Sequence, residues 1–393
     1  MNTALTRLAR CCQTLPPALP LVLAGLSGLA GAADLTPLQP AAPIKQVRCD
    51  HGDSLAAALT RARPGSTLKI SGTCHEAVTI TTDRLQLQGA ASAVLDGTAS
   101  NAHAVLSIDG ARGVGLKNLV VRGGPDFGVK WTRGAQGRME KITATGHGGV
   151  GLGIDGADVE VDGLILENNG GNGMDAYSGA SVVMSGTVVA SDNGGDGLAV
   201  NAKTYLELRG ATVTASNNGG TGVNVINDSR LQILSFAQAQ TSSLTATSNG
   251  FAGIGLLGST LGVVGAQYFG SGSIVLHASG NAIGLFMPAG AILSPHATAR
   301  FEISQNGVGM VMEDGASALI VGGLRVSQNQ TGVSAIGAGT LTLVSVPPNP
   351  SNVSGNQQDL VLGFGTRITL DGVAVGSVTC DASVLARGSV GCP

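Results

Sequence analysis

Two aspartates and a tyrosine are the residues of this chain best suited to chemistry. Asp155 and Asp175 follow successive copies of a glycine-marked repeat, and Tyr177 follows Asp175 by two residues. On neighbouring strands, one repeat and two residues apart, the carboxylates would lie on the order of 8 Å from each other. Inverting glycosidases use that separation, with one carboxyl group protonating the leaving oxygen and the other activating water. The sequence therefore makes Asp155, Asp175 and Tyr177 the candidate catalytic residues, with Lys130 helping to position a sugar.

The elements that must hold these residues come from an internal repeat. The phrase Asn169-Gly-Gly-Asn-Gly-Met recurs from Asn193 and from Asn218. Degenerate copies continue it, so that ten landmarks run from Gly128 to Asp359, and each period holds up to three short runs of alternating apolar residues. This predicts an all-β parallel β-helix of about ten coils with three short strands each, stacked at ~4.8 Å. A leucine-rich repeat has a similar period, but its Leu frame and its helical pattern are absent.

The outer face of the predicted coils divides into two halves. The second and fourth residues after each landmark point outward and form what we call the polar stripe: Lys130, Asp155, Asp175, Tyr177, Asn201 and Asn224. Lys130, Asn201, Lys203 and Asn224 are the candidate binding residues. In later coils the equivalent positions carry Leu257, Phe286 and Val311, which we call the apolar stripe. An exposed apolar stripe predicts contact with a protein partner or self-association. The alternative is that the insertions 235–243 and 266–272 or the tail after Pro350 cover it.

The ends of the chain predict export and capping. Residues 1–32 contain Arg7, Arg10, an apolar stretch and Ala30-Gly31-Ala32, which is typical of a signal peptide. We expect an exported protein, periplasmic or extracellular, with no membrane span after signal removal. Residues 33–74 would form an N-terminal cap, 75–375 the β-helix and 376–393 a C-terminal cap. A short capping helix is expected over 53–62 with Asp53 as its N-cap.

Four cysteines remain outside the signal peptide, one pair near each end of the mature chain. An even number of cysteines in an exported chain predicts disulfides, here Cys49–Cys74 and Cys380–Cys392. We expect no metal site, because the chain has no CxxC or Cys/His cluster and only one copy of a calcium-type nonapeptide, and we expect no cofactor. A net charge of −3 without basic clusters argues against nucleic acid as a partner.

A resemblance to a known family supports this fold. Four segments look like the N-terminal part of pectate-lyase-like right-handed parallel β-helices: Ser54–Leu59, Pro64–Ile70, Gly72–Cys74 and Leu85–Gly89. The Asn/Gly coils resemble the generic repeats of the same proteins. The resemblance implies a right-handed solenoid. It implies no single activity, because the superfamily includes lyases, hydrolases, epimerases and adhesins. Gly146-His147-Gly148 resembles a polygalacturonase motif, but its companion elements are missing, so His147 is expected to be a turn residue.

Two classes of function follow from these observations. The first, which the missing catalytic motifs and sparse charge favour, is a secreted or periplasmic protein that binds a polysaccharide or serves as a surface scaffold without catalysis. The alternative is a polysaccharide-degrading enzyme acting through Asp155 and Asp175. A hydrolase is preferred over a lyase, since no second basic residue accompanies Lys130 or Lys203. The polar stripe also fits an ordinary solvated strand face.

Overall fold

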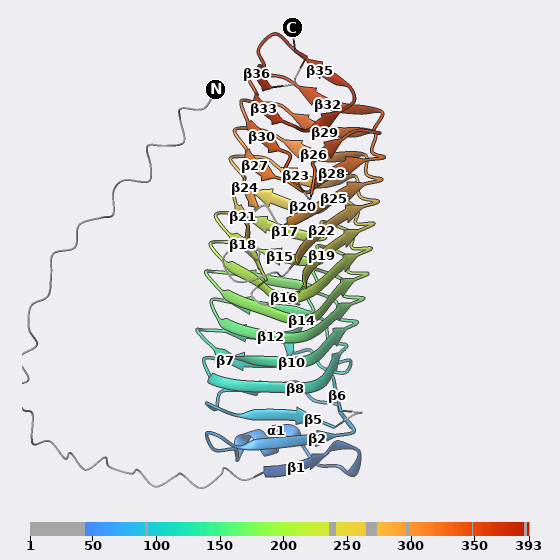
Figure 1. Cartoon of the computed structure of the whole chain (residues 1–393). Coiled ribbons are helices and arrows are strands. Elements are labelled where there is room, and N and C mark those ends of the chain that lie inside the picture. The colour runs from blue at the N-terminus through green and yellow to red at the C-terminus, as the bar shows by residue number, and fades with distance from the viewer. Residues whose placement is uncertain are drawn as a thin grey trace, which may run out of the picture. The chain divides into compact units, whose positions relative to one another are not determined.

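The computed structural model describes residues 44–393 except 91–92, 236–240, 265–272, 296–298, 348, 389–390 and 393. The expected signal peptide therefore lies outside the described residues. The chain forms a right-handed parallel β-solenoid, as expected, with one sheet of 23 strands (sheet A) and one of 13 strands (sheet B). Figure 1 shows the strands stacked in chain order from β1 to β36.

Sheet B contributes one strand to each coil, and its strands pair in parallel with a coil-to-coil register. They are β4 (Val78–Ile80), β7 (Ala104–Asp109), β9 (Phe127–Thr132), β11 (Leu152–Asp155), β13 (Met174–Tyr177), β15 (Leu198–Val200), β17 (Val223–Ile226), β20 (Ala252–Leu257), β23 (Ile283–Met287), β26 (Val308–Met312), β29 (Thr331–Ala335), β32 (Gln358–Leu362) and β35 (Val378–Cys380). The solenoid thus has about thirteen coils, not ten. The landmark count missed β4, β7 and β35, because these strands lack the Asn/Gly phrase.

Sheet A contributes the other strands of each coil. They are β1 (Ile44–Arg48), β2 (Thr67–Ser71), β3 (Thr73–Cys74), β5 (Gln86–Gly89), β6 (Val94–Asp96), β8 (Arg112–Arg122), β10 (Gln136–Thr145), β12 (Asp158–Glu167), β14 (Ser181–Ser191), β16 (Tyr205–Ser216), β18 (Arg230–Leu234), β19 (Thr241–Thr247), β21 (Thr260–Val264), β22 (Ser273–Ser279), β24 (Ile292–Pro295), β25 (Ala299–Ser304), β27 (Ser317–Val321), β28 (Leu324–Ser327), β30 (Thr340–Val344), β31 (Asn352–Val353), β33 (Arg367–Asp371), β34 (Ala374–Val375) and β36 (Leu385–Gly388).

Five coils depart from the predicted three short strands. In β8, β10, β12, β14 and β16 two of the three segments run together into one bent strand of 10 to 12 residues. Each bend lies at a residue with positive φ: Asn118, Lys141, Gly163, Gly186 and Gly210, and β8 has a second such residue, Gly113, near its start. One left-handed residue turns the chain without a loop, so a turn that the sequence suggested as a break lies inside the strand.

A ladder of buried asparagines runs along one corner of the solenoid. Each Nδ2 donates to Oδ1 of the next member at 2.8–3.1 Å, through Asn169, Asn193, Asn218, Asn249, Asn281, Asn306, Asn329 and Asn356. The backbone N–H of the buried His147 donates to Asn169 at the start of the ladder, and Asp359 accepts from Asn356 at its end. The ladder extends over eight coils, with one asparagine in each.

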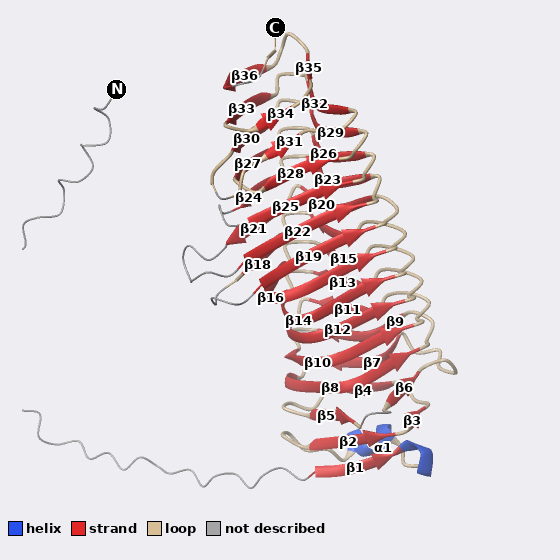
Figure 2. Ribbon diagram, turned by 45° about the vertical axis from the view of Figure 1, so that its right-hand side comes forward, coloured by secondary structure: helices blue, strands red, loops and turns tan. Residues whose placement is uncertain are grey.

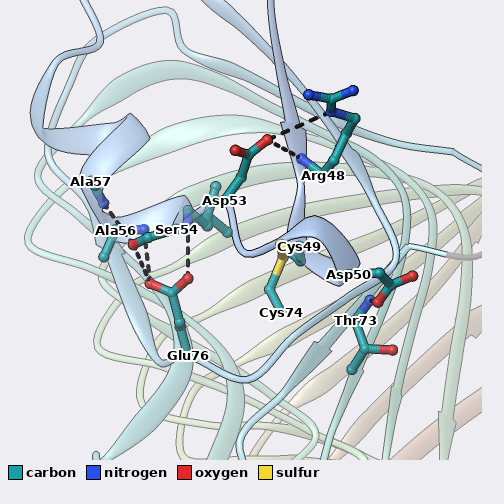
Figure 3. Close-up of a disulfide and its surroundings, with 11 residues drawn as sticks. Arg48, Cys49, Asp50, Asp53, Ser54, Ala56, Ala57, Thr73, Cys74 and Glu76 are labelled. Carbon is teal, nitrogen blue, oxygen red and sulfur yellow. Dashed lines mark hydrogen bonds and ion pairs between the residues drawn. A yellow bond between two sulfur atoms is a disulfide. The ribbon is translucent and has the colours of Figure 1, made fainter.

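The N-terminal end is closed by a short helix, α1 (Leu55–Thr60), and a 3-10 turn, η1 (Cys49–His51). The expected cap residue was wrong by one position, because Ser54 and not Asp53 accepts from the N–H of Ala57, while Asp53 accepts from the N–H of Arg48. Glu76 accepts from the Ser54 hydroxyl and from two free N–H groups of the first turn of α1, as Figure 3 shows. Leu55 and Ala58 of α1 are buried in the core.

Both predicted disulfides are present. Cys49 pairs with Cys74 and Cys380 with Cys392, with Cα atoms 5.0 and 5.8 Å apart. Figure 3 shows the first bridge beside the start of α1. Among the described residues, no helix has the length and apolar character needed to cross a bilayer.

Candidate functional site

The outer face of sheet B brings most of the predicted site residues together. Figure 2 shows its strands β9, β11, β13 and β15 stacked side by side. Lys130, Gly153, Asp175, Ala199 and Asn224 are successive partners across β9 to β17. Register partners on successive strands form a column across the sheet. In the column next to this one, Asp155 of β11 is the register partner of Tyr177 of β13. Asp155 and Asp175 are thus on adjacent strands two residues out of register, on the order of 8 Å apart, while their catalytic role stays a prediction.

Tyr177 lies at the centre of the acidic part of this face. Burial raises the pKa of its phenol, and the carboxylates of Asp155, Asp175 and Asp126 raise it further, in that order. A phenol surrounded by carboxylates stays protonated, because the phenolate would be repelled by each of them. Tyr177 is therefore a hydrogen-bond donor on a half-buried aromatic ring.

Asp175 is set apart from the other carboxylates by its surroundings. Burial raises its pKa, and the nearby carboxylate of Asp196 adds to the effect. Asp196 comes from the turn before β15 and is fixed there, since its side chain accepts from the N–H of Thr221 at 2.6 Å and from Nδ2 of Asn224 at 2.8 Å. This arrangement favours the protonated form of Asp175, which is the form that a general acid needs.

Lys130 belongs to a cluster at the other end of the stripe. Its Nζ lies 2.9 Å from Nε2 of His103 and 4.2 Å from the ring centroid of Phe127. Nδ1 of His103 in turn donates to the carboxylate of Asp126. A β-carbon at Gly153 would lie 2.6 Å from the Phe127 ring, so the ring approaches the backbone of the next coil closely. The result is an aromatic surface with a cation above it.

Sequence reasoning missed four residues of this face, His103, Asp126, Phe127 and Asp196. All lie at or just before the place where a sheet B strand begins, whereas the predicted positions come after each landmark glycine. The signal was present in the sequence, because Phe127 and Asp196 occupy the same position, each directly before a landmark glycine, Gly128 or Gly197. Side chains at that position reach the next coil, as the bond between Asp196 and Asn224 shows.

Two predicted binding residues lie at the rim of the face. Asn201 follows β15, and its Oδ1 accepts from Nδ2 of Asn227 at 2.8 Å. Lys203 is exposed and has a φ of 62° in the turn 201–204 between β15 and β16. Of the four predicted binding residues, Lys130 and Asn224 therefore lie on the strands of the stripe.

The connections beside the stripe are short. On one side they comprise 146–151, 168–173, 192–197 and 217–222, and on the other 156–157, 178–180, 201–204 and 227–229. Turns of two to six residues border the face but build no walls over it. A depression of about 500 Å³ lies on sheet A, away from every predicted site residue. It is lined by Gln86, Gly115, Arg138, Asp158, Glu160 and Ser181 among others.

The apolar stripe continues the same columns. Asn224, Gly255, Phe286 and Val311 are successive register partners. Leu257 is 40% exposed and Phe286 is half-buried, whereas Val311 is only 7% exposed. Phe251, which the prediction omitted, is 43% exposed and contacts Phe286 edge to face with ring centroids 5.2 Å apart. Most of the two insertions that were considered as cover lies outside the described residues.

In the part of the chain that the structure describes, no group of three or more His, Cys, Asp or Glu side chains could hold a metal ion.

Comparison with known proteins gives a match to a family pattern and a structural likeness. Residues 69–213 match the family described as right handed beta helix region. The crystal structure of pectate lyase Pel9A aligns with 86% of this chain and 78% of its own, at 14% sequence identity and a TM-score of 0.37. No curated protein matches the chain significantly. The matched family region contains β9 to β15 and hence the polar stripe except Asn224.

Proposed function

We propose that this protein binds a polysaccharide along the outer face of sheet B, from β9 to β17, without cleaving it. The observation that carries the proposal is the open polar stripe, which crosses neighbouring coils and is bordered only by turns of two to six residues. A long polymer can lie along such a face without threading an end. A cleft for catalysis normally surrounds its substrate and excludes water, and these short turns supply no such enclosure.

The side chains of the stripe suit sugar hydroxyl groups. The carboxylates of Asp155 and Asp175 can accept from hydroxyls, Tyr177 can donate, and the Phe127 ring offers an apolar surface to the C–H face of a pyranose. The repeat of an extended β-linked glycan is close to the ~4.8 Å coil spacing, so successive sugars can meet successive coils. Because carboxylates outnumber cations on the face, we expect neutral glycans to bind better than uronates. The disulfides are compatible with export, and the ligand is then a periplasmic or extracellular glycan.

Hydrolysis is a second candidate, favoured by the raised pKa of Asp175. In this function Asp175 would protonate the leaving oxygen and Asp155 would activate water, at the separation of an inverting enzyme. The two candidates differ in product, since only hydrolysis releases new reducing ends.

The test is a glycan panel against the purified protein and two variants of the stripe, Tyr177→Ala and Asp175→Asn. We expect Tyr177→Ala to weaken binding by roughly tenfold, the loss of one aromatic contact and one hydrogen bond. Arg138→Ala, in the depression on sheet A, is the matched control and should leave the affinity unchanged. Loss of binding in the control alone would transfer the site to sheet A, and a panel without any bound glycan would contradict the proposal.

The same panel separates binding from hydrolysis. If reducing ends appear with the wild type and disappear with Asp155→Asn and Asp175→Asn, the second candidate is correct. If binding persists in both variants and no reducing ends form, the protein is a binding protein.

A further inference from the structure

The face proposed to bind the glycan does not end at β17. Phe286 of β23 lies in the same column as Asn224, with Gly255 between them. Beside it Phe251 is 43% exposed and contacts the Phe286 ring edge to face. The polar stripe therefore leads, after a single position without a side chain, to an aromatic pair of which Phe251 is exposed and Phe286 is half-buried.

The long repeats do not interrupt this face. Two periods of the sequence are 31 residues long, and their additional residues fall between β18 and β19 and between β21 and β22, which are all strands of sheet A. The connections that lead into β20 and β23 remain short, at 248–251 and 280–282. Seven strands from β9 to β23 are thus consecutive neighbours in sheet B, and six coil spacings cover about 29 Å.

Aromatic rings occur at both ends of this length and inside it. Phe127 lies at one end, Tyr177 in the middle, and Phe251 with Phe286 at the other end. Beside the terminal rings the surface of sheet B forms a flat floor, because Gly153 and Gly255 have no side chain. A β-carbon at Gly255 would lie 3.1 Å from Oδ1 of Asn224. Aromatic rings over a flat floor suit the apolar faces of sugar rings, and the polar stripe between them suits the hydroxyl groups.

We infer that Phe251 and Phe286 form a distal aromatic subsite for the same polysaccharide, a neutral β-linked chain of at least five or six sugars. This inference rests on the proposed function and extends its footprint across six coil spacings. A protein partner suits the patch less well. The exposed apolar side chains here are Phe251 and Leu257, with Val311 buried, whereas each partner of a specific protein interface buries about 800 Å².

The test uses chain length as the variable. Dissociation constants are measured for three-sugar and six-sugar members of two neutral β-linked series, the cello- and chito-oligosaccharides. We expect the hexasaccharide to bind at least tenfold more tightly than the trisaccharide in at least one series, since only the longer chain reaches from Tyr177 to Phe286. Phe251→Ala and Phe286→Ala should remove most of that gain and leave trisaccharide binding unchanged, while Tyr177→Ala should weaken both.

Leu319→Ala is the matched control, because Leu319 is 45% exposed on β27 of sheet A, outside the proposed face. It should change neither constant, and thermal melts of all variants should confirm that each is folded. Weakening by Tyr177→Ala without any effect of the two Phe variants on the hexasaccharide would overturn the distal subsite and leave the proposed function standing. If neither series binds, or if the binding is insensitive to Tyr177→Ala, the result would count against the proposed function itself. If the Phe variants changed only self-association, measured by sedimentation, the apolar stripe would be a protein contact and the distal subsite would be refuted.

Discussion

Replacing Asn218 by alanine removes one member from the middle of the asparagine ladder. The Asn218 side chain is 2% exposed and makes four hydrogen bonds. Its Nδ2 donates to Oδ1 of Asn249 at 2.9 Å and to the carbonyl of Ala190 at 3.0 Å. Its Oδ1 accepts from the backbone N–H of Asn193 at 3.2 Å and from Nδ2 of Asn193 at 2.9 Å.

The expected cost follows from the groups that lose their partners. In Asn218→Ala the N–H of Asn193, one Nδ2 hydrogen of Asn193 and the carbonyl of Ala190 each lose the bond that they make to this side chain. Oδ1 of Asn249 keeps the bond from the backbone N–H of residue 218 at 3.2 Å. A buried polar group without a partner costs about 1 to 3 kcal/mol, and water entering the small cavity offsets part of this. We expect the free energy of unfolding to fall by about 3 to 5 kcal/mol.

The assay is equilibrium denaturation in urea, with the midpoint and the slope compared between variants. Asn352→Ala is the control, because Asn352 is exposed on β31, and it should stay within about 0.5 kcal/mol of the wild type. Asn218→Asp keeps the shape but loses both Nδ2 donors, so it should destabilise at least as much as alanine. If Asn218→Ala were as stable as the control, the ladder would contribute no net stability and the reasoning would be refuted.

Three further predictions concern the ends of the ladder and of the solenoid. Burial lowers the pKa of His147, so the unfolded chain binds a proton more readily than the folded one. Stability should therefore fall as the pH drops below the ordinary value of 6.5. His147→Asn should remove that dependence in melts from pH 7 to 5. Glu76→Gln removes the charge and replaces one accepting oxygen by an NH2 donor, so that Leu55 and Ala56 can no longer both donate to separate oxygens, and it should lower stability by at least about 1 kcal/mol in thermal melts. Cys392→Ser should release Cys380 and speed hydrogen exchange in β35, with little change in β20.

Repetition explains why the fold could be predicted from the sequence. The Asn/Gly phrase predicts both the turn and the stacking of coils. Two cysteines lie near each end of the mature chain, and the predicted disulfide within each pair is confirmed. The errors occurred where the phrase is absent, since β4, β7 and β35 carry no Asn landmark. The merging of strands at Gly186 and Gly210 was equally hidden, because a glycine with positive φ can end a strand or bend it.

The candidate site was only partly predictable for a different reason. Alternation along a strand indicates which side chains of that strand point outward, and so Asp155, Asp175 and Tyr177 were placed on one face. It does not indicate which residues at or just before the start of a strand reach across from the preceding coil. Phe127 and Asp196 act on the stripe in this way, as the close approach of Phe127 to Gly153 shows. The depression on sheet A likewise depends on the glycines of one coil, Gly113 and Gly115, which lie beside long side chains of the neighbouring coils.

The uneven length of the repeats bears on what kind of ligand the solenoid can recognise. Sheet B strands keep their residue-to-residue pairing through both 31-residue periods, while the additional residues enter between strands of sheet A. A residue inserted in sheet B would reverse the facing of every side chain after it, whereas an insertion at a sheet A turn disturbs no register. The spacing of groups along the sheet B face is therefore set by the coil spacing alone. A ligand that uses the whole face must itself repeat at about 4.8 Å, as an extended polymer does and a compact protein surface does not.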